Sequence, residues 1–191
     1  MENYELICQI GKGNFGSISK IIRKSDQKVL VWKELDYGQM SEKEKQQIVS
    51  EVNILRELKH QNIVRYYDRI LDKKHAKIYI IMEYCEGGDL GQLIKRCKKN
   101  KDYIAEDVIW KIFTQIVLAL HLCHTRKEGK VLHRDIKPEN LVLDSNGYVH
   151  ITDFGIAKKY TPLNGKDTSG TMGYIAPEVL RSENHTYCVD F

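Results

Sequence analysis

Four polar side chains with complementary chemistry lie close together in the second half of the chain. They bring two carboxylates, one amide and one amine into 19 residues of predicted turns and short strands: Asp135, Lys137, Asn140 and Asp153. Turns are rich in Asp, Asn, Pro and Gly in any case, so composition alone would fit a polar turn region. The order of these groups fits phosphoryl transfer, in which a carboxylate accepts a hydroxyl proton, oxygen ligands hold Mg²⁺ and an ammonium group neutralises phosphate.

A glycine-rich stretch, GKGNFG, lies near the N-terminus, with Gly11, Gly13 and Gly16 in the spacing G-x-G-x-x-G. Dinucleotide-binding proteins share this spacing and place an acid about 20 residues further on, here Asp36, but their motif opens a helix. The residues that follow, SISKIIRK and SDQK, instead predict a strand that enters a hairpin. Backbone N–H groups of a glycine loop between two antiparallel strands can approach phosphate oxygens closely, so we interpret the stretch as a phosphate-binding loop.

A lysine and a glutamate form a second candidate pair. Lys33 ends the apolar run VLVWK, where a lysine usually lays its stem along the surface and keeps its charge in water. Glu51 argues for a different arrangement, because helical spacing directs it to the apolar side of its helix, between Leu55 and Leu58. A carboxylate that faces a core is costly unless it is paired. We therefore expect an ion pair between Lys33 and Glu51, which would hold the lysine against nucleotide phosphates.

Hydrophobic patterns predict the elements that position these residues. The beginning of the chain alternates as strands do, and KIYIIMEY is predicted to be a buried strand. Ser41 and Glu44 form a capping box in front of an amphipathic helix. A second, strongly apolar helix covers residues 105–124, and the two short runs LVL and VHIT flank the turn DSNG. Trp32 and Trp110 are predicted to be core or pocket-wall residues.

The composition is that of an ordinary soluble domain. The chain has 191 residues, of which 42% are hydrophobic and 29% charged, and its net charge of +4 is far from the signature of nucleic-acid binding. Five cysteines without metal-ligand spacing predict reduced thiols in an intracellular compartment. The N-terminus does not read as a signal peptide, and no run of 18 apolar residues occurs. We expect a cytoplasmic protein with no nucleic-acid partner and no membrane segment.

Three motifs in order, HRDIKPEN, DFG and APE, resemble those of the protein kinase family. The resemblance covers the whole chain and implies one kinase domain, residues 4–191, with an α+β fold in two lobes. The N-lobe, residues 1–84, would hold an antiparallel sheet and one main helix, and residues 85–191 would form part of a helical C-lobe. The resemblance implies an enzyme that transfers the γ-phosphate of ATP, with Mg²⁺, to a Ser or Thr hydroxyl of a protein substrate. The residues KPEN after Asp135 resemble Ser/Thr kinases rather than tyrosine kinases.

The resemblance also implies a role for each group of the catalytic region. Asp135 would be the catalytic base, and Lys137 would steady the transferring phosphate. Asn140 and Asp153 would bind Mg²⁺. The remaining ATP-binding residues would be Ile10, Gly11, Lys12, Gly13, Asn14, Phe15, Gly16, Ser17, Ile18, Val31, Lys33, Glu51, Glu83, Cys85, Asp89 and Val142.

Within that set, the resemblance distinguishes the parts of the nucleotide that would be contacted. Lys33 would contact the α- and β-phosphates, and Met82 would be the gatekeeper beside the adenine. Glu83 and Cys85 would offer backbone hydrogen bonds, and Asp89 would hold the ribose. The adenine ring would be sandwiched by Ile10, Ile18, Val31 and Val142.

A closer resemblance changes along the chain. The segments LVWKELDYG, SEVNILRELKHQNIVRYYDRI and MEYCEGGDL are similar to the NIMA-related kinases, which implies a role in the cell cycle or at the centrosome and cilium. From about His133 onward, HRDIKPENLVLDSNGYVHITDFGIAKKY and GTMGYIAPEV are more similar to the AGC group. Ala176 stands where NIMA-related kinases usually have Ser.

The resemblance also directs attention to the activation segment. Arg134 marks kinases in which a phosphate–Arg pair orders this segment. Asp167 occupies the position, three before Gly170, where both groups usually carry the phosphorylated Thr. Either Asp167 supplies a permanent substitute charge, or Thr168 is the phosphorylated residue, or Asp167 is an ordinary solvated loop acid.

The end of the chain carries two further expectations. Asp190 stands where related kinases place a buried helix acid that braces the HRD backbone. Kinase domains extend well beyond APE, so we expect the C-lobe to be truncated at Phe191 and the chain alone to be marginally stable. The alternative to an active enzyme is a truncated, non-catalytic nucleotide-binding or scaffold fragment.

Overall fold

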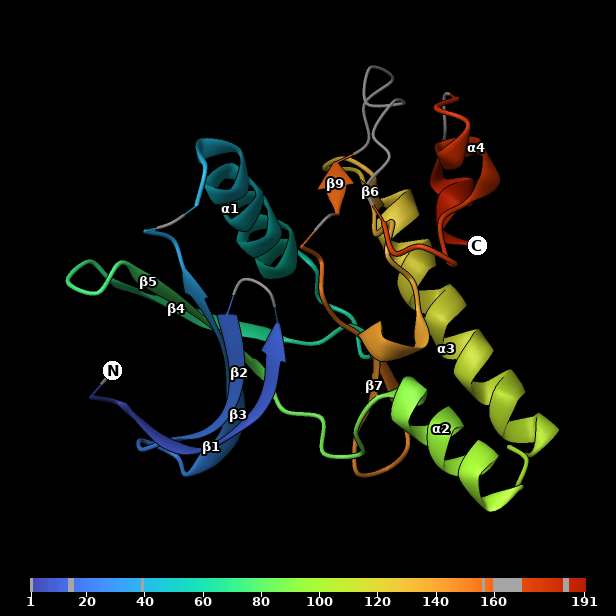
Figure 1. Cartoon of the computed structure of the whole chain (residues 1–191), viewed down its shortest axis with the longest axis horizontal. Coiled ribbons are helices and arrows are strands. Elements are labelled where there is room, and N and C mark those ends of the chain that lie inside the picture. The colour runs from blue at the N-terminus through green and yellow to red at the C-terminus, as the bar shows by residue number, and fades with distance from the viewer. Residues whose placement is uncertain (1, 14–15, 39, 156, 160–169, 184–185) are drawn as a thin grey trace. The chain divides into compact units, whose positions relative to one another are not determined.

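The computed structural model resolves the chain into two compact units, and each is described by itself (Figure 1). The first unit contains residues 1–56 and 64–84, and the second contains residues 57–63 and 85–191. The structure describes residues 2–13, 16–38, 40–155, 157–159, 170–183 and 186–191. Asn14, Phe15, Asp167 and Thr168, which the sequence analysis singled out, lie outside the described residues. The functional lobe boundary at residues 84 and 85 stays a prediction.

An antiparallel sheet of five strands, in the order β1-β2-β3-β5-β4, forms the body of the first unit. The strands are β1 (Tyr4–Gly13), β2 (Gly16–Arg23), β3 (Lys28–Asp36), β4 (Tyr66–Asp72) and β5 (Lys77–Glu83). The segment after GKGNFG is strand β2, which pairs with β1 from Gly16 onward, so the dinucleotide-binding alternative is wrong. Only glycine fits at position 16, because a Cβ there would lie 1.7 Å from the carbonyl oxygen of Glu34.

One face of this sheet carries an apolar cluster that includes Trp32, so the prediction that Trp32 is a core residue is confirmed. Its members are Ile21, Leu30, Trp32, Tyr79 and Ile81. Strand alternation places Lys33 on the opposite face from Trp32. Helix α1 (Glu42–Glu57) begins with the predicted capping box, in which the Glu44 carboxylate accepts from Ser41 N at 2.8 Å and Ser41 Oγ accepts from Glu44 N at 3.3 Å.

The second unit is built from helices and short strand pairs. Its helices are α2 (Leu90–Asn100), α3 (Glu106–Thr125), η1 (Pro138–Asn140), α4 (Pro177–Leu180) and η3 (Tyr187–Asp190). The two apolar runs around the turn DSNG form the antiparallel strands β7 (Leu141–Leu143) and β8 (Val149–Ile151), and β6 (Val131–Leu132) pairs with β9 (Lys158–Lys159). The α+β class and the antiparallel sheet of the first unit are therefore confirmed.

Helix α3 is less covered than its composition suggested. Its C-terminal half buries Ala119, Leu120 and Cys123, but Trp110 is 58% exposed, so the prediction that Trp110 is a core residue is wrong, and its alternative role in a pocket wall stays a prediction. Sequence periodicity shows that a helix face is apolar and leaves open what packs against it. By length and composition α3 could also cross a membrane, a weak criterion that core helices of soluble proteins satisfy, and no other described helix meets it. The expected lack of a membrane segment stays a prediction.

A buried amide joins the short segment 57–63 to the rest of the second unit. Asn62 is fully buried, and its Nδ2 donates to the carbonyl oxygen of Val149 at 2.8 Å and to Oε1 of Gln115 at 3.0 Å. The same Gln115 oxygen accepts from Val149 N at 2.7 Å. Ile63 extends the contact as a parallel bridge to Ile151. One amide therefore ties this segment to both α3 and β8.

We expect the substitution Asn62→Ala to lower the free energy of unfolding by about 1–3 kcal/mol, because it leaves the Val149 carbonyl without the Asn62 donor and removes one of the two hydrogen bonds that the Gln115 oxygen accepts. Urea unfolding followed by circular dichroism measures the change. The matched control is Gln61→Ala, which removes an exposed amide from the neighbouring position and should change stability by less than about 0.5 kcal/mol. Equal effects in the two variants would contradict the proposed role of the buried amide.

Candidate active site

An ion pair in the first unit joins β3 to α1. Lys33 Nζ lies 2.9 Å from Oε1 of Glu51, and the exposed fractions of the two side chains are 21% and 5%. Because Glu51 is buried among apolar residues of α1, the lysine supplies the counter-charge that this carboxylate needs. The predicted pair is confirmed, and its ammonium group is held at a fixed place on the sheet.

The predicted nucleotide-binding residues are divided between the two units. In the first unit, the described residues of the glycine stretch lie where β1 ends and β2 begins: Ile10, Gly11, Lys12, Gly13, Gly16, Ser17 and Ile18. Val31 lies on β3 directly opposite Met82 of β5, and Glu83 ends β5. Both Val31 and Met82 are buried.

In the second unit, the structure brings Asp89 and Val142 together through an isolated β-bridge. Cys85, the first residue of the segment 85–191 of this unit, is half-buried. Asp89 also caps α2, because its Oδ1 accepts from Gln92 N at 2.8 Å. That bond fixes the orientation of the Asp89 side chain. The roles of these residues toward a nucleotide stay predictions.

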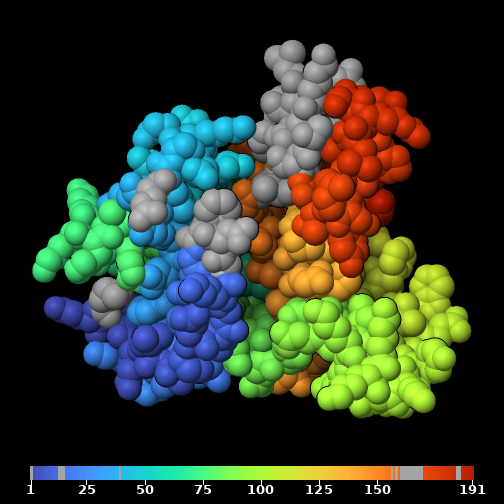
Figure 2. Space-filling view, viewed as in Figure 1, coloured from blue at the N-terminus to red at the C-terminus, as the bar shows by residue number. Residues whose placement is uncertain are grey.

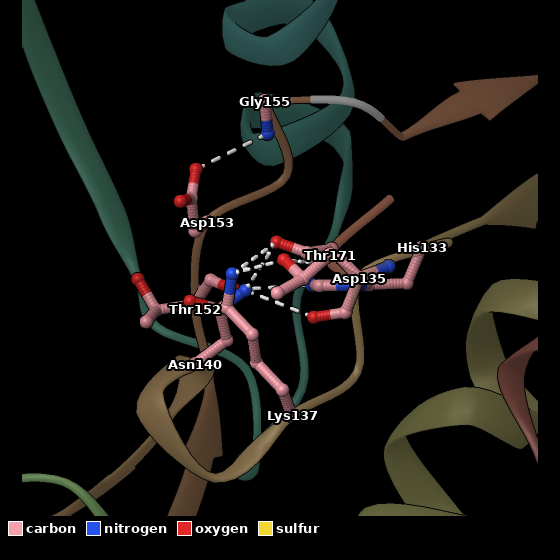
Figure 3. Close-up of polar contacts among 8 residues, drawn as sticks. All are labelled: His133, Asp135, Lys137, Asn140, Thr152, Asp153, Gly155 and Thr171. Carbon is pink, nitrogen blue, oxygen red and sulfur yellow. Dashed lines mark hydrogen bonds and ion pairs between the residues drawn. The ribbon is translucent and has the colours of Figure 1, made fainter. Parts of the chain in front are cut away.

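The carboxylate of Asp135 is the centre of a hydrogen-bond cluster, shown in Figure 3. Lys137 Nζ lies 2.8 Å from Asp135 Oδ2, and Asn140 Nδ2 donates to the same oxygen at 2.9 Å. Thr171 Oγ1 donates to the other oxygen, Oδ1, at 2.5 Å, and Lys137 Nζ also donates to Thr171 Oγ1 at 2.6 Å. Three of these four residues were predicted, and the structure brings them together.

Thr171 was missed by the sequence analysis. It lies 36 residues after Asp135, in the segment that precedes APE, where no hydrophobic periodicity gives a direction to side chains. The only sequence signal is a hydroxyl residue between Gly170 and Gly173, which is weak by itself. The contact shows that this segment is fixed directly to the predicted catalytic base.

The cluster sets the charge state of Asp135. Partial burial by itself raises the pKa of the Asp135 carboxyl, but the hydrogen bonds from Lys137 and Thr171, with the charge of Lys137, outweigh it. The net effect holds the pKa below its ordinary value. Asp135 is therefore ionised at neutral pH and able to accept a hydrogen bond from a hydroxyl group.

Asn140 and Asp153 are suited to bind a divalent cation. Asn140 directs Nδ2 toward the Asp135 backbone and side-chain oxygens, both at 2.9 Å, which leaves its carbonyl oxygen Oδ1 as an available ligand. Asp153 is an exposed carboxylate held in the left-handed region at φ 60°. No group of three or more His, Cys, Asp or Glu side chains lies together among the described residues, so the candidate ligands are one amide and one carboxylate. These oxygen donors fit Mg²⁺, which usually keeps several waters or phosphate oxygens.

The backbone connects these two residues. Thr152 N donates to the carbonyl oxygen of Asn140 at 3.0 Å, directly before Asp153. His133 binds the carbonyl oxygen of Thr152 at 3.0 Å through Nε2, and its ring packs edge-on against the fully buried Phe154 at 4.7 Å between centroids. The two segments that carry Asp135 and Asp153 are thus fixed to each other.

The imidazole of His133 is held in one neutral form. Asp135 N lies 3.3 Å from His133 Nδ1, while Nε2 faces the Thr152 carbonyl. A neutral ring with its proton on Nε2 satisfies both contacts, since Nδ1 then accepts and Nε2–H donates. Burial lowers the pKa of His133, which keeps the ring neutral.

A buried acid from the end of the chain supports the same loop. Asp190, in η3, accepts from His133 N at 2.9 Å, from Arg134 N at 2.6 Å and from His124 Nε2 at 2.7 Å. Arg134 adopts a left-handed backbone with φ 67°, which costs on the order of 1–3 kcal/mol in a non-glycine residue. The expectation that Asp190 braces the HRD backbone is confirmed.

The amino-acid sequence of this chain is similar to those of known proteins. The family profile described as "Protein kinase domain" matches residues 4–191. The chain is 55% identical over 181 residues to "Probable serine/threonine-protein kinase nek2" of Dictyostelium discoideum. It is 52% identical over 183 residues to "Serine/threonine-protein kinase Nek2" of Homo sapiens, and 40% identical over 210 residues to "G2-specific protein kinase nimA" of Emericella nidulans.

These similarities extend over nearly the whole chain but only part of each relative. They cover 94%, 94% and 97% of this chain and 43%, 41% and 30% of the respective relatives. The chain therefore spans less than half the length of these relatives. The resemblance to NIMA-related kinases is confirmed, and the finer resemblance of the region after His133 to the AGC group stays a prediction.

We expect the protein to lose stability on acidification because of His133. The folded pKa of His133 lies below its unfolded value of about 6.5, so the unfolded state binds the proton more readily and the free energy of unfolding falls below about pH 6.5. Urea unfolding between about pH 5.5 and pH 8 measures this slope. The variant His133→Phe, although less stable overall, should lose that part of the slope. A slope that is unchanged in His133→Phe would contradict the assignment.

Proposed function

This chain belongs to the protein kinase family, and from that membership we propose that it transfers the γ-phosphate of ATP to a Ser or Thr hydroxyl of a protein substrate. The observation that carries the proposal is the cluster around Asp135, where an ionised carboxylate, the ammonium of Lys137 and the hydroxyl of the sequence-distant Thr171 lie within 2.8 Å of one another. Phosphoryl transfer needs a hydroxyl acceptor group beside a phosphate-binding cation, and this cluster provides both.

Each candidate catalytic or metal-binding residue of the second unit has a defined task in this proposal. Asp135 accepts the hydrogen bond of the substrate hydroxyl and orients it, and Lys137 Nζ stands beside it to stabilise negative charge on the transferred group. Asn140 Oδ1 and Asp153 would hold Mg²⁺, which when bound neutralises phosphate charge. In the first unit, Lys33, fixed by Glu51, would contact the α- and β-phosphates.

The remaining nucleotide contacts are part of the same proposal. Backbone N–H groups of the glycine stretch would approach the phosphates, and Glu83, Cys85 and Asp89 would bind the adenine and ribose. We further propose a role in cell-cycle signalling in the cytoplasm, which the similarity to a relative named as G2-specific supports. Regulation by a negative charge at Asp167 or by phosphorylation of Thr168 belongs to the proposal as well.

The variant Asp135→Asn should lower the rate of peptide phosphorylation by about 10²-fold or more, because an amide cannot accept the hydroxyl proton. Nucleotide binding, measured with a fluorescent ATP analogue, should remain because Asp135 is not one of the predicted ATP-binding residues. Transfer of labelled phosphate to a Ser-containing peptide measures turnover, and Asp107→Asn on the exposed face of α3 is the control. If the unchanged chain binds nucleotide with no transfer, the non-catalytic alternative is correct.

We expect Thr171→Val to lower kcat by about 10-fold to 100-fold with little change in the KM for ATP. The change removes a hydrogen bond to an ionised carboxylate, which is worth about 1.5–3 kcal/mol, and each 1.4 kcal/mol corresponds to about tenfold. Thr171→Ser keeps the hydroxyl and should retain most of the activity. Equal losses in the valine and serine variants would show that Thr171 acts through packing rather than through its hydroxyl.

A further inference from the structure

The net positive charge of this chain is equal to that of a short segment at one end of helix α2. We name the residues Lys95, Arg96, Lys98, Lys99 and Lys101 the basic end of α2. The stretch 90–105 contains these five basic residues and a single acid, Asp102, which gives it the net charge of +4 that the whole chain carries. The other parts of the sequence contain 25 basic and 25 acidic residues. The net charge of the molecule is therefore equal to the net charge of this one segment.

All five side chains are exposed, and α2 itself contains no acid that could neutralise them. Within the described part of the chain, none of the five forms an ion pair or a side-chain hydrogen bond with another residue. Figure 2 shows this segment on the surface, in yellow-green at the lower right. The cations are thus free to meet a partner.

The helix itself does not explain so many cations. Basic residues stabilise the C-terminal end of a helix dipole, but this effect is limited to the last turn, which here contains Lys98 and Lys99. Lys95 lies one turn earlier and, at spacings of three and four residues, repels both of them. A solvated surface helix usually mixes the two signs of charge. The basic end of α2 therefore destabilises its own helix, so helix stability does not account for these charges, whereas the binding of an anionic partner would.

The cluster is small enough to act as one site. From Lys95 to Lys101 the helix rises roughly 9 Å, which is about one Debye length at moderate salt. An extended peptide covers this distance with about three residues. We propose that the basic end of α2 binds an acidic run of three or more Asp or Glu residues in a protein substrate. The inference rests on the proposed function in one respect, namely that the bound protein is the substrate.

The structure favours a peptide over the other anionic partners. Binding to a nucleic-acid duplex distributes phosphate contacts over a long surface, whereas this chain is neutral outside the segment 90–105. An amphipathic helix that binds a membrane inserts an apolar face. In α2 that face is used inside its own unit, since Leu90 is buried, Leu93 and Ile94 are half-buried, and the helix packs on η1 and β7.

The test is an equilibrium binding measurement on the 191-residue chain, so it does not depend on turnover. The probe is a fluorescein-labelled peptide with four consecutive glutamates next to one serine, and fluorescence anisotropy gives its Kd. Binding should weaken as salt rises from about 50 to 200 mM. The variant K95Q/R96Q/K98Q/K99Q should weaken it by about tenfold or more. The control K24Q/K43Q/K73Q/K74Q removes the same charge from scattered exposed lysines and should change Kd less than twofold.

Three outcomes would overturn the inference: no measurable binding of the peptide, equal weakening in the two quadruple variants, or stronger α2-dependent binding to phosphatidylserine vesicles or to a short DNA duplex. Circular dichroism of both variants shows that they are folded. In a phosphorylation assay, the α2 variant should raise the KM of the acidic peptide and leave its kcat unchanged. If the peptide binds through α2 but is not phosphorylated, the proposed function fails while the binding site stands.

Discussion

The structure of the second unit depends on the hydrogen bonds that replace water around one buried carboxylate. Asp190 has lost contact with water, and a buried carboxylate is costly unless hydrogen bonds replace its hydration. Its three donors are His124 Nε2 and the backbone N–H groups of His133 and Arg134. Those two N–H groups belong to an irregular loop without a strand partner, so they need an acceptor as much as the acid needs donors. This mutual requirement holds Arg134 in its left-handed conformation and fixes the loop to the end of the chain.

The same constraint extends to the reacting groups through a series of short contacts. Because the backbone at His133 is fixed, its buried ring can bind both the Asp135 N–H and the Thr152 carbonyl in a single neutral form. Thr152 is bonded in turn to Asn140 and directly precedes Asp153, so both candidate Mg²⁺ ligands depend on this ring. The first unit solves a similar problem in another way, since the buried Glu51 is compensated by a cation, Lys33, rather than by backbone groups.

The parts of this architecture that local rules govern could be predicted from the residues themselves. Contacts between distant segments without periodicity could not, and the role of Asp190 was expected only from the resemblance to kinases. Helical spacing placed Glu51 on an apolar face, and the cost of an unpaired buried acid led to Lys33. The strand after GKGNFG followed from its alternation and the turn behind it. In contrast, the bond from Thr171 to Asp135 spans 36 residues through a segment without periodicity, so no local rule indicates it. The exposure of Trp110 was missed because periodicity identifies an apolar face and leaves its coverage undetermined.

The bonds around Asp135 also determine how a hydroxyl group could approach it. A carboxylate has about four acceptor positions, two on each oxygen. Oδ2 accepts from both Lys137 and Asn140 and is therefore filled, whereas Oδ1 accepts from Thr171 alone among the described residues. A substrate hydroxyl would thus bind at the remaining position of Oδ1, beside the Thr171 hydroxyl and within reach of Lys137. Because its pKa is depressed, Asp135 is a weak base, and its main contribution in the proposed reaction is to orient the hydroxyl until the developing phosphate bond makes the proton acidic.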